Sequence, residues 1–280
     1  MSKIKILVDG GCDLPQEILK KYDINVVGLN VSFGNDESFI AGEEIDNETF
    51  YKRMGEMKEL PKTSCPSPDR FLEAYKGEGD ILLLSVSSKL SGTYSSAKLA
   101  KDMYDSDFAD KKIEIIDTLN GSIGQGLLAI KAAELVLQGK SLEEIVEEIE
   151  KIKDDVIFYG TLETLENAIK GGRINPLAGK IINTLNLKAI VQITEGVVKP
   201  IDKARGLNNS LKKVLEYIDK NLENVEDKTI IIGHAHCSDK AIKIKEVLAN
   251  KYNAKKIIIS EVGPVMGTYA SQGAILVSYL

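Results

Sequence analysis

The sequence predicts a two-domain α/β protein, and three observations support this fold class. The chain has 280 residues, a length that suggests about two domains of roughly 150 residues each. Over the first 160 residues, runs rich in Ile, Leu and Val alternate with amphipathic stretches, which is typical of a mainly parallel sheet covered by helices. Beyond them, a two-residue turn joins two strand-like runs and indicates antiparallel pairing. We therefore expect an N-terminal α/β/α domain at 1–160 and a C-terminal α+β domain with an antiparallel sheet at 161–280, with the boundary between residues 155 and 175.

The N-terminal domain is predicted from four apolar runs and three helical patterns. The runs suit strands buried on both faces of a sheet, and they lie at 4–8, 81–86, 113–117 and 156–160. The helical patterns carry apolar residues at three-and-four spacing, and they lie at 95–104, 123–138 and 142–153. Asp13 precedes Pro15 and is predicted to cap the first helix, with Gln16 at the capping-box position.

The C-terminal domain is predicted to begin its regular structure with a β-hairpin. Runs at 189–194 and 197–201 flank the dipeptide Glu195-Gly196, a strong hairpin signal. Helical patterns at 208–222 and 239–252 alternate with strand-like runs at 229–233 and 256–261. This order indicates an α+β arrangement.

Composition and charge exclude several classes of protein. The chain carries 36 Lys plus Arg against 42 Asp plus Glu, a net charge of −6, so no global field attracts nucleic acid or an anionic membrane. No apolar run is long enough to cross a membrane. Cys12, Cys65 and Cys237 are far apart and form neither a disulfide framework nor a zinc motif. His234 and His236 are too few to complete a metal site. We expect a cytoplasmic protein with no metal and no cofactor.

A loop rich in hydroxyl groups joins the predicted strand at 81–86 to the helix at 95–104. Between Ser85 and Ala97 it holds seven Ser and Thr residues and one glycine. Backbone N–H groups at a helix N-terminus attract anions, so this loop is suited to a carboxylate or a phosphate. The alternative is that Ser88 or Ser91 only caps the helix.

Three other segments carry polar groups that suit a binding site. Prolines in 61–68 stiffen the chain around Thr63, although the segment also reads as a rigid turn into a helix at 69–76. Asp9 ends the first strand, at the sheet edge where open α/β proteins bind ligands, and it either orients the hydroxyl groups of the serine-rich loop or is a solvated carboxylate. Arg173 follows two glycines, and Arg205 lies after the hairpin. Arginine suits oxyanions, but isolated arginines are commonly surface charges.

Five segments, taken in order, resemble the DegV family. They are Asp9 to Pro15, the Thr63-Ser64-x-Pro-Ser loop, the Leu90-Ser91-Gly92-Thr93-Tyr94 loop, Gly171 to Ile174, and Gly263 to Thr268. The match spans essentially the whole chain, and five ordered motifs at consistent intervals make it specific. Better-understood members of this family are similar to the lipid-binding subunit of bacterial fatty acid kinase.

The resemblance implies a protein that binds a long-chain fatty acid such as palmitate. The tail would lie in an apolar tunnel, and loop hydroxyl groups would hold the carboxylate. The chain itself would catalyse nothing, because better-understood members present the carboxylate to a separate ATP-dependent kinase, which forms an acyl phosphate. Nucleic acid is not among the implied partners.

The resemblance also assigns residues to roles. Thr63 and Ser91 match the family's carboxylate-binding positions. Arg173 and Arg205 match arginines associated with the acyl-phosphate head group or with kinase docking. Supporting contacts to the head group are expected from Thr93, Asp9 and Tyr269.

Two positions depart from the family pattern, and two other functions compete with lipid binding. Gly10 stands where the family usually has a serine, and Tyr269 where it usually has a histidine, although the tyrosine hydroxyl can still donate a hydrogen bond. One alternative is an acyl or phosphoryl transferase or hydrolase with Ser91 or Thr63 as nucleophile and Asp9 as base. The other is a nucleotide-binding module that uses the serine-rich loop for phosphate.

Overall fold

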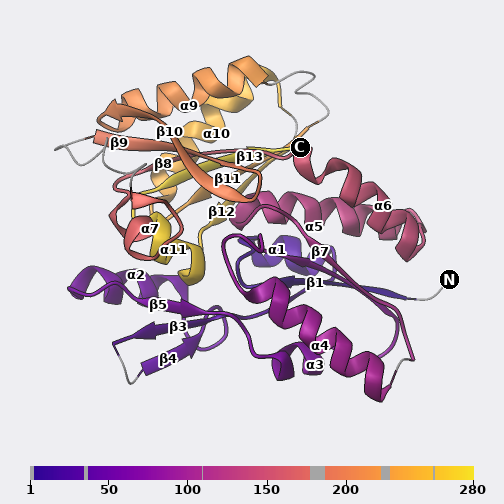
Figure 1. Ribbon diagram of the computed structural model, residues 1–280. Helices are drawn as coiled ribbons and strands as arrows, with labels where there is room; N and C mark the ends of the chain where they lie inside the picture. The colour runs from indigo at the N-terminus through magenta and orange to yellow at the C-terminus, as the bar shows by residue number, and fades with distance from the viewer. Residues whose placement is uncertain (1–2, 35–36, 109, 177–186, 222–227, 255) are drawn as a thin grey trace.

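Three β-sheets organise the chain in the computed structural model, which describes residues 3–34, 37–108, 110–176, 187–221, 228–254 and 256–280. A four-stranded sheet and a six-stranded sheet form the two main parts, and a small three-stranded sheet lies beside them (Figure 1). The fold class predicted from the sequence is confirmed, since the first sheet is parallel and the larger sheet is mostly antiparallel.

The N-terminal sheet has the strand order β2-β1-β6-β7, and all neighbours run parallel. Its strands are β1 (Ile4–Asp9), β2 (Ile24–Val27), β6 (Asp80–Ser85) and β7 (Ile113–Asp117). Helices of this part are α1 (Gln16–Lys21), α3 (Pro68–Tyr75), α4 (Thr93–Asp107) and α6 (Leu142–Ile152), followed by the 3-10 turn η1 (Lys153–Asp155). Val8 joins the central core, whereas Leu7 packs with Phe71 and Ala97 of α3 and α4. Both faces of the sheet are therefore buried, as successive side chains alternate between them.

The small sheet lies between β2 and α3 in the chain and has the order β4-β3-β5. Its antiparallel strands are β3 (Asn30–Phe33), β4 (Glu37–Ile40) and β5 (Lys62–Ser64), and α2 (Asn47–Glu56) connects β4 to β5. Asp46 caps α2 by accepting a hydrogen bond from the Thr49 N–H at 2.7 Å. These strands are short and largely polar, which is why sequence patterning did not predict them. Because β5 is one of these strands, Thr63 lies on a strand opposite Val31 and not in an irregular loop.

The C-terminal sheet has the order β10-β9-β8-β13-β11-β12, and only the β11–β12 pair among these described strands is parallel. Its strands are β8 (Ile157–Leu162), β9 (Leu187–Thr194), β10 (Val197–Arg205), β11 (Thr229–His234), β12 (Lys256–Glu261) and β13 (Ile275–Tyr279). Its helices are α7 (Glu166–Lys170), α9 (Leu207–Asn221), α10 (Ser238–Tyr252) and α11 (Pro264–Ala270). The predicted hairpin is confirmed: Glu195 and Gly196 both have positive φ, 53° and 79°, as the favoured two-residue turn requires. Residue 222, the predicted end of the helix that forms α9, lies outside the described residues.

A buried helix, α5 (Ser122–Leu137), lies between the two larger sheets (Figure 1). It contacts β1 and β6 on one side and β11 and β13 on the other. Twelve of its sixteen residues are buried, as expected of a helix that is apolar on nearly every side. The two main parts consequently share one hydrophobic core, which includes Val8, Leu128 and Leu276.

Two local predictions are wrong. The run at 156–160, predicted to join the parallel sheet, forms β8 and pairs antiparallel with β9 and β13. A short apolar run is buried in either sheet, so its composition does not determine its partners. Asp13 does not cap a helix. Pro15 occupies the N-cap of α1, and the Asp13 carboxylate instead accepts hydrogen bonds from Ser122 and Gly263.

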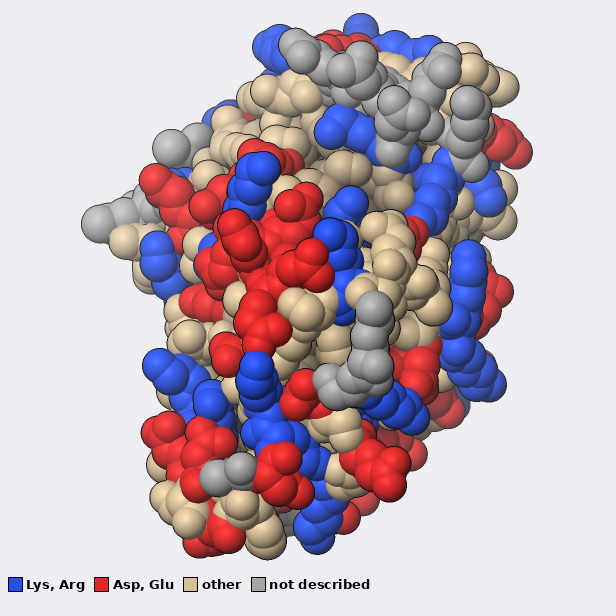
Figure 2. All heavy atoms as spheres, turned by 90° about the vertical axis from the view of Figure 1, so that its right-hand side faces the viewer, with Lys and Arg blue, Asp and Glu red and all other residues tan. Residues whose placement is uncertain are grey.

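Acidic and basic side chains are interspersed over the face drawn in Figure 2, and among the described residues seen there the basic ones form no continuous surface. This distribution agrees with the small net charge of the chain. Among the described helices, none combines the length and the apolar character that crossing a membrane requires.

Candidate functional site

An apolar pocket lies where the three sheets and α11 meet. The small sheet and the loops after β1 and β6 form one side, and β8, β9, β10 and β13 form the other. The space between its walls, including the open mouth, is about 770 Å³. Its apolar lining consists of Leu29, Val86, Leu90, Phe158, Leu162, Ala168, Val191, Ile193, Val198, Val265, Met266, Ala270 and Leu276, with Gly11 beside them.

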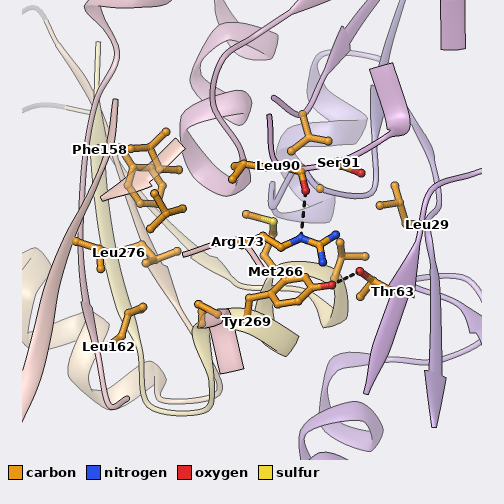
Figure 3. Close-up of a pocket in the computed structure, with 18 residues that line it drawn as sticks. Leu29, Thr63, Leu90, Ser91, Phe158, Leu162, Arg173, Met266, Tyr269 and Leu276 are labelled. Atoms are coloured by element: carbon orange, nitrogen blue, oxygen red, sulfur yellow. Dashed lines mark hydrogen bonds between the residues drawn. The ribbon is translucent and has the colours of Figure 1, made fainter. Parts of the chain in front are cut away.

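The pocket has a polar end and an apolar end. Figure 3 shows Thr63 and Ser91 on one side of the pocket and Phe158, Leu162 and Leu276 on the other. Among the described lining residues, Arg173 is the only one with a charged side chain. The arrangement therefore suits a molecule with a long apolar part and a small head group.

The hydroxyl group of Thr63 meets that of Tyr269 at the polar end. Their oxygen atoms lie 2.5 Å apart, although 206 positions separate the two residues in the chain. β5 supplies Thr63 and α11 supplies Tyr269, so the contact joins the N-terminal and C-terminal parts of the protein (Figure 3). Tyr269 thus stands beside Thr63 at the polar end of the pocket.

Ser91 reaches the same pocket from the loop before α4. Its Oγ lies 2.8 Å from Thr93 Oγ1 and accepts the Thr93 N–H at 3.3 Å. Gly92 occupies the N-cap of α4 without a side-chain bond, so Ser91 contributes to capping while its side chain lines the pocket. Thr93 is fully buried and lies behind Ser91, where it orients that hydroxyl group and does not line the pocket itself.

Arg173 lies across the ring of Tyr269. Its guanidinium carbon is 4.5 Å from the ring centroid, a cation–π geometry, and Gly171 has no Cβ that would collide with the ring. Nε donates to the Leu90 carbonyl at 3.1 Å (Figure 3), and Nη1 donates to the Gly171 carbonyl at 2.6 Å. A guanidinium carries five N–H donors, so donors remain for an anionic head group after these two bonds.

Asp9 lies behind the pocket, fully buried. Its carboxylate accepts hydrogen bonds from the N–H of Val86 at 2.7 Å, the N–H of Gly11 at 2.9 Å and the hydroxyl group of Ser85 at 3.0 Å. Burial, the largest cause, raises the pKa of this carboxyl group, and these three bonds oppose the shift. Asp9 therefore holds two backbone segments of the pocket wall. Its hydrogen bonds reach Ser85 and not Ser91.

The structure does not bring Arg205 to the pocket. Arg205 ends β10, seven residues beyond the lining residue Val198 on the same strand; at about 3.3 Å per residue the two lie roughly 23 Å apart. The paired histidines also lie elsewhere: His234 Nδ1 accepts the Cys237 N–H, and His236 contacts Glu261. The part of the chain that the structure describes contains no cluster of side chains able to hold a metal ion.

The apolar walls are the part of the site that sequence reasoning missed. Phe158, Leu162, Val191 and Leu276 come from three strands of the C-terminal sheet and face one cavity. Each strand reads as a buried run, which does not tell a cavity wall from an ordinary core position. The weak signal in the sequence is Gly160 inside an apolar run, because glycine within a strand often marks a close approach; a Cβ there would lie 2.8 Å from a side-chain carbon of Leu276, which would have to shift.

Comparison with known proteins identifies the family. The model described as “Uncharacterised protein, DegV family” matches residues 3–280. The chain belongs to the DegV family. A DegV domain-containing protein of Clostridium perfringens is 34% identical over 289 residues, covering 100% of this chain and 98% of the relative. Another from Clostridium acetobutylicum is 37% identical over 278 residues, covering 98% and 97%.

Solved structures of DegV proteins share the whole architecture. One from Ruminococcus gnavus, described with vaccenic acid, aligns with a TM-score of 0.90 at 28% identity and covers 98% of this chain and 99% of its own. The Streptococcus pneumoniae fatty acid kinase B3 protein, loaded with linoleic acid, aligns with a TM-score of 0.89 at 28% identity and covers 99% of each chain. Bacillus subtilis DegV, described as a fatty acid binding protein, gives 0.86 at 28% identity, covering 100% and 99%.

Proposed function

We propose that this DegV protein binds one long-chain fatty acid in the apolar pocket, with the carboxylate at the hydroxyl groups of Thr63 and Ser91. The proposal rests on one observation, the separation of apolar and polar side chains within one cavity. Its walls are aliphatic and aromatic, and its one polar end combines neutral hydroxyl groups with Arg173. The fatty acids carried by the relatives, vaccenic and linoleic acid, support the same ligand class.

The tail supplies the affinity in this proposal. Burying about 14 methylene groups at about 0.8 kcal/mol each contributes roughly 11 kcal/mol before the entropic cost of association. Hydrogen bonds from hydroxyl groups then orient the carboxylate at the mouth. The pocket draws on both predicted units, since Thr63 and Ser91 belong to 1–160, and Tyr269 and Arg173 belong to 161–280.

The proposed role is that of a carrier that presents the carboxylate to a partner kinase. The kinase-subunit relative supports this role. The geometry gives the alternative enzyme little support: Thr63 bonds to Tyr269 and Ser91 to Thr93, so no described carboxylate or imidazole activates either hydroxyl group. Arg173 is positioned to contact a phosphorylated head group, whereas exposed Arg205 is left as a partner contact. All three cysteines are free, which fits the expected reducing compartment.

Calorimetric titration of lipid-free protein tests the proposal. Palmitate should bind with a stoichiometry of one, whereas ATP should give no heat, and an acyl ester incubated with the protein should stay intact. Binding of ATP without binding of palmitate would support the nucleotide-module alternative. Ester turnover that Ser91→Ala abolishes would support the enzyme alternative.

A further inference from the structure

A buried carboxylate, Asp13, joins three segments of the chain next to the pocket. Oδ1 accepts the Gly263 N–H at 2.7 Å, and Oδ2 accepts the Ser122 hydroxyl group at 2.5 Å. Ser260, at the end of β12, donates to the Asp13 backbone carbonyl at 3.0 Å. The loop after β1, the start of α5 and the loop before α11 therefore meet at one side chain.

The donors to this carboxylate are all neutral. Among the described ion pairs none includes Asp13, and burial raises the pKa of its carboxyl group to about 7. Cys12 on its own loop, Tyr51 of α2 and Glu261 of β12 are the titratable groups near it, and Lys20 of α1 lines the same pocket without a described ion pair to Asp13. A buried carboxyl group without a cationic partner is costly, and here its two oxygen atoms accept the hydrogen bonds that join the three segments.

The segment that Asp13 holds is the entry to α11. Gly263 is the N-cap of this seven-residue helix, and a helix so short depends on tertiary contacts for its placement. α11 supplies Val265, Met266, Tyr269 and Ala270 to the pocket. A shift at its start would therefore move four lining residues together.

We propose that Asp13 is a positioning residue of the binding site: its bond to the Gly263 N–H fixes α11 against the N-terminal sheet and so places Tyr269 beside Thr63. This inference rests on the proposed function, because its main readout is fatty acid affinity. Other contacts hold α11 from other directions. Tyr51 donates to the Val262 carbonyl at 2.8 Å, and Asn167 donates to the Thr268 carbonyl at 3.1 Å. Of these three anchors, Asp13 is the one that comes from the loop at the edge of the parallel sheet.

Three variants separate positioning from simple stability. Asp13→Ala removes the acceptor for the Gly263 N–H. Asp13→Asn keeps an acceptor oxygen at nearly the same position and is the conservative rescue. Ser260→Ala is the matched control, because Ser260 is equally buried and contacts Asp13, yet only through the backbone carbonyl.

Palmitate affinity and amide hydrogen exchange of the ligand-free protein are measured for each variant. Asp13→Ala should weaken palmitate binding about tenfold, as expected for the loss of one hydrogen bond, whereas the other two variants should stay within about threefold of wild type. Exchange should rise at 263–271 in Asp13→Ala and stay unchanged in α6. If Asp13→Ala folds poorly, palmitate affinity and hydrogen exchange are compared between Asp13→Asn and Ser122→Ala instead. Ser122→Ala should then raise hydrogen exchange at the start of α5 more than in α11.

Two results would overturn the inference. The first is that Asp13→Ala binds palmitate with the affinity of wild type and shows the hydrogen exchange of wild type at 263–271. The other is a rise in exchange over the whole chain with no preference for α11, which indicates a structural role only. Failure of the proposed function gives a different pattern: wild-type protein would not bind palmitate, while the exchange measurement would still report on α11.

Discussion

The double substitution Thr63→Val and Ser91→Ala should weaken fatty acid binding and leave the tail pocket intact. Valine has nearly the shape of threonine, and alanine removes only the serine hydroxyl group. In the ligand-free protein these hydroxyl groups bond to Tyr269 and Thr93. Binding replaces those neutral hydrogen bonds with bonds to a carboxylate, so the variant loses only the difference between the two kinds of bond.

The size of the effect follows from that difference. A hydrogen bond to a charged group contributes about 1.5–3 kcal/mol and a neutral one about 0.5–1.5 kcal/mol, so each hydroxyl group accounts for about 1 kcal/mol. Two of them give about 2 kcal/mol, which corresponds to a Kd roughly 30-fold higher. The fall is modest because the tail supplies most of the affinity.

Displacement of a fluorescent fatty acid from lipid-free protein measures this change, with the methyl ester of palmitate as the control ligand. Wild type should prefer the free acid to the ester, and this preference should be smaller in the variant, where Arg173 and Tyr269 are the head-group donors that remain. An unchanged affinity for the free acid, or a preference for the acid as large as that of wild type, would refute the assignment of the head-group site.

Three other predictions follow from the same geometry. Phe158→Ala should shift the preference toward fatty acids with longer chains, because each methylene group that enters the freed space contributes about 0.8 kcal/mol, roughly fourfold in affinity. Competition between palmitate and longer acids measures this preference, and the same order of affinities as in wild type would show that Phe158 does not limit the tail. Gly171→Ala places a Cβ 2.3 Å from the Tyr269 ring and should displace that ring. The free energy of unfolding should fall by about 1–3 kcal/mol, and fatty acid binding should weaken. A variant with the melting temperature and the fatty acid affinity of wild type would contradict this. The pKa of Asp13 is raised to about 7 in the folded protein from about 3.9 in the unfolded chain, so its contribution to stability is present below pH 4 and is lost as the pH rises to 7. The difference in free energy of unfolding, Asp13→Asn minus wild type, should therefore rise by up to about 4 kcal/mol between pH 4 and pH 7. Chemical denaturation at several pH values measures this difference, and a difference that does not change with pH would contradict the prediction.

Features encoded over a few residues were predictable from the sequence. The Glu195-Gly196 hairpin follows from a turn that needs positive φ at both positions. The serine-rich loop was placed at the start of a helix, and the structure puts Ser91 there with its side chain in the pocket. In both cases the local chemistry determines the local conformation.

Contacts between distant segments were not predictable. Tyr269 and Thr63 are 206 residues apart, and the geometry of their meeting depends on how α11 docks against β5. Arg205 and Val198 share a strand, but only one end of that strand reaches the pocket. Asp13 has the sequence pattern of a helix cap, yet the packing of α5 and β12 around it provides other donors. Such arrangements depend on the assembly of three sheets, which local patterns do not specify.

Mass spectrometry of the protein as purified from its host, first under native conditions and then after denaturing extraction, tests the central claim most directly. We predict one equivalent of a long-chain fatty acid that stays with the folded protein and is released on unfolding, with a mass that reports the preferred chain. A protein that is empty as purified and that also fails to take up added fatty acids would contradict the account.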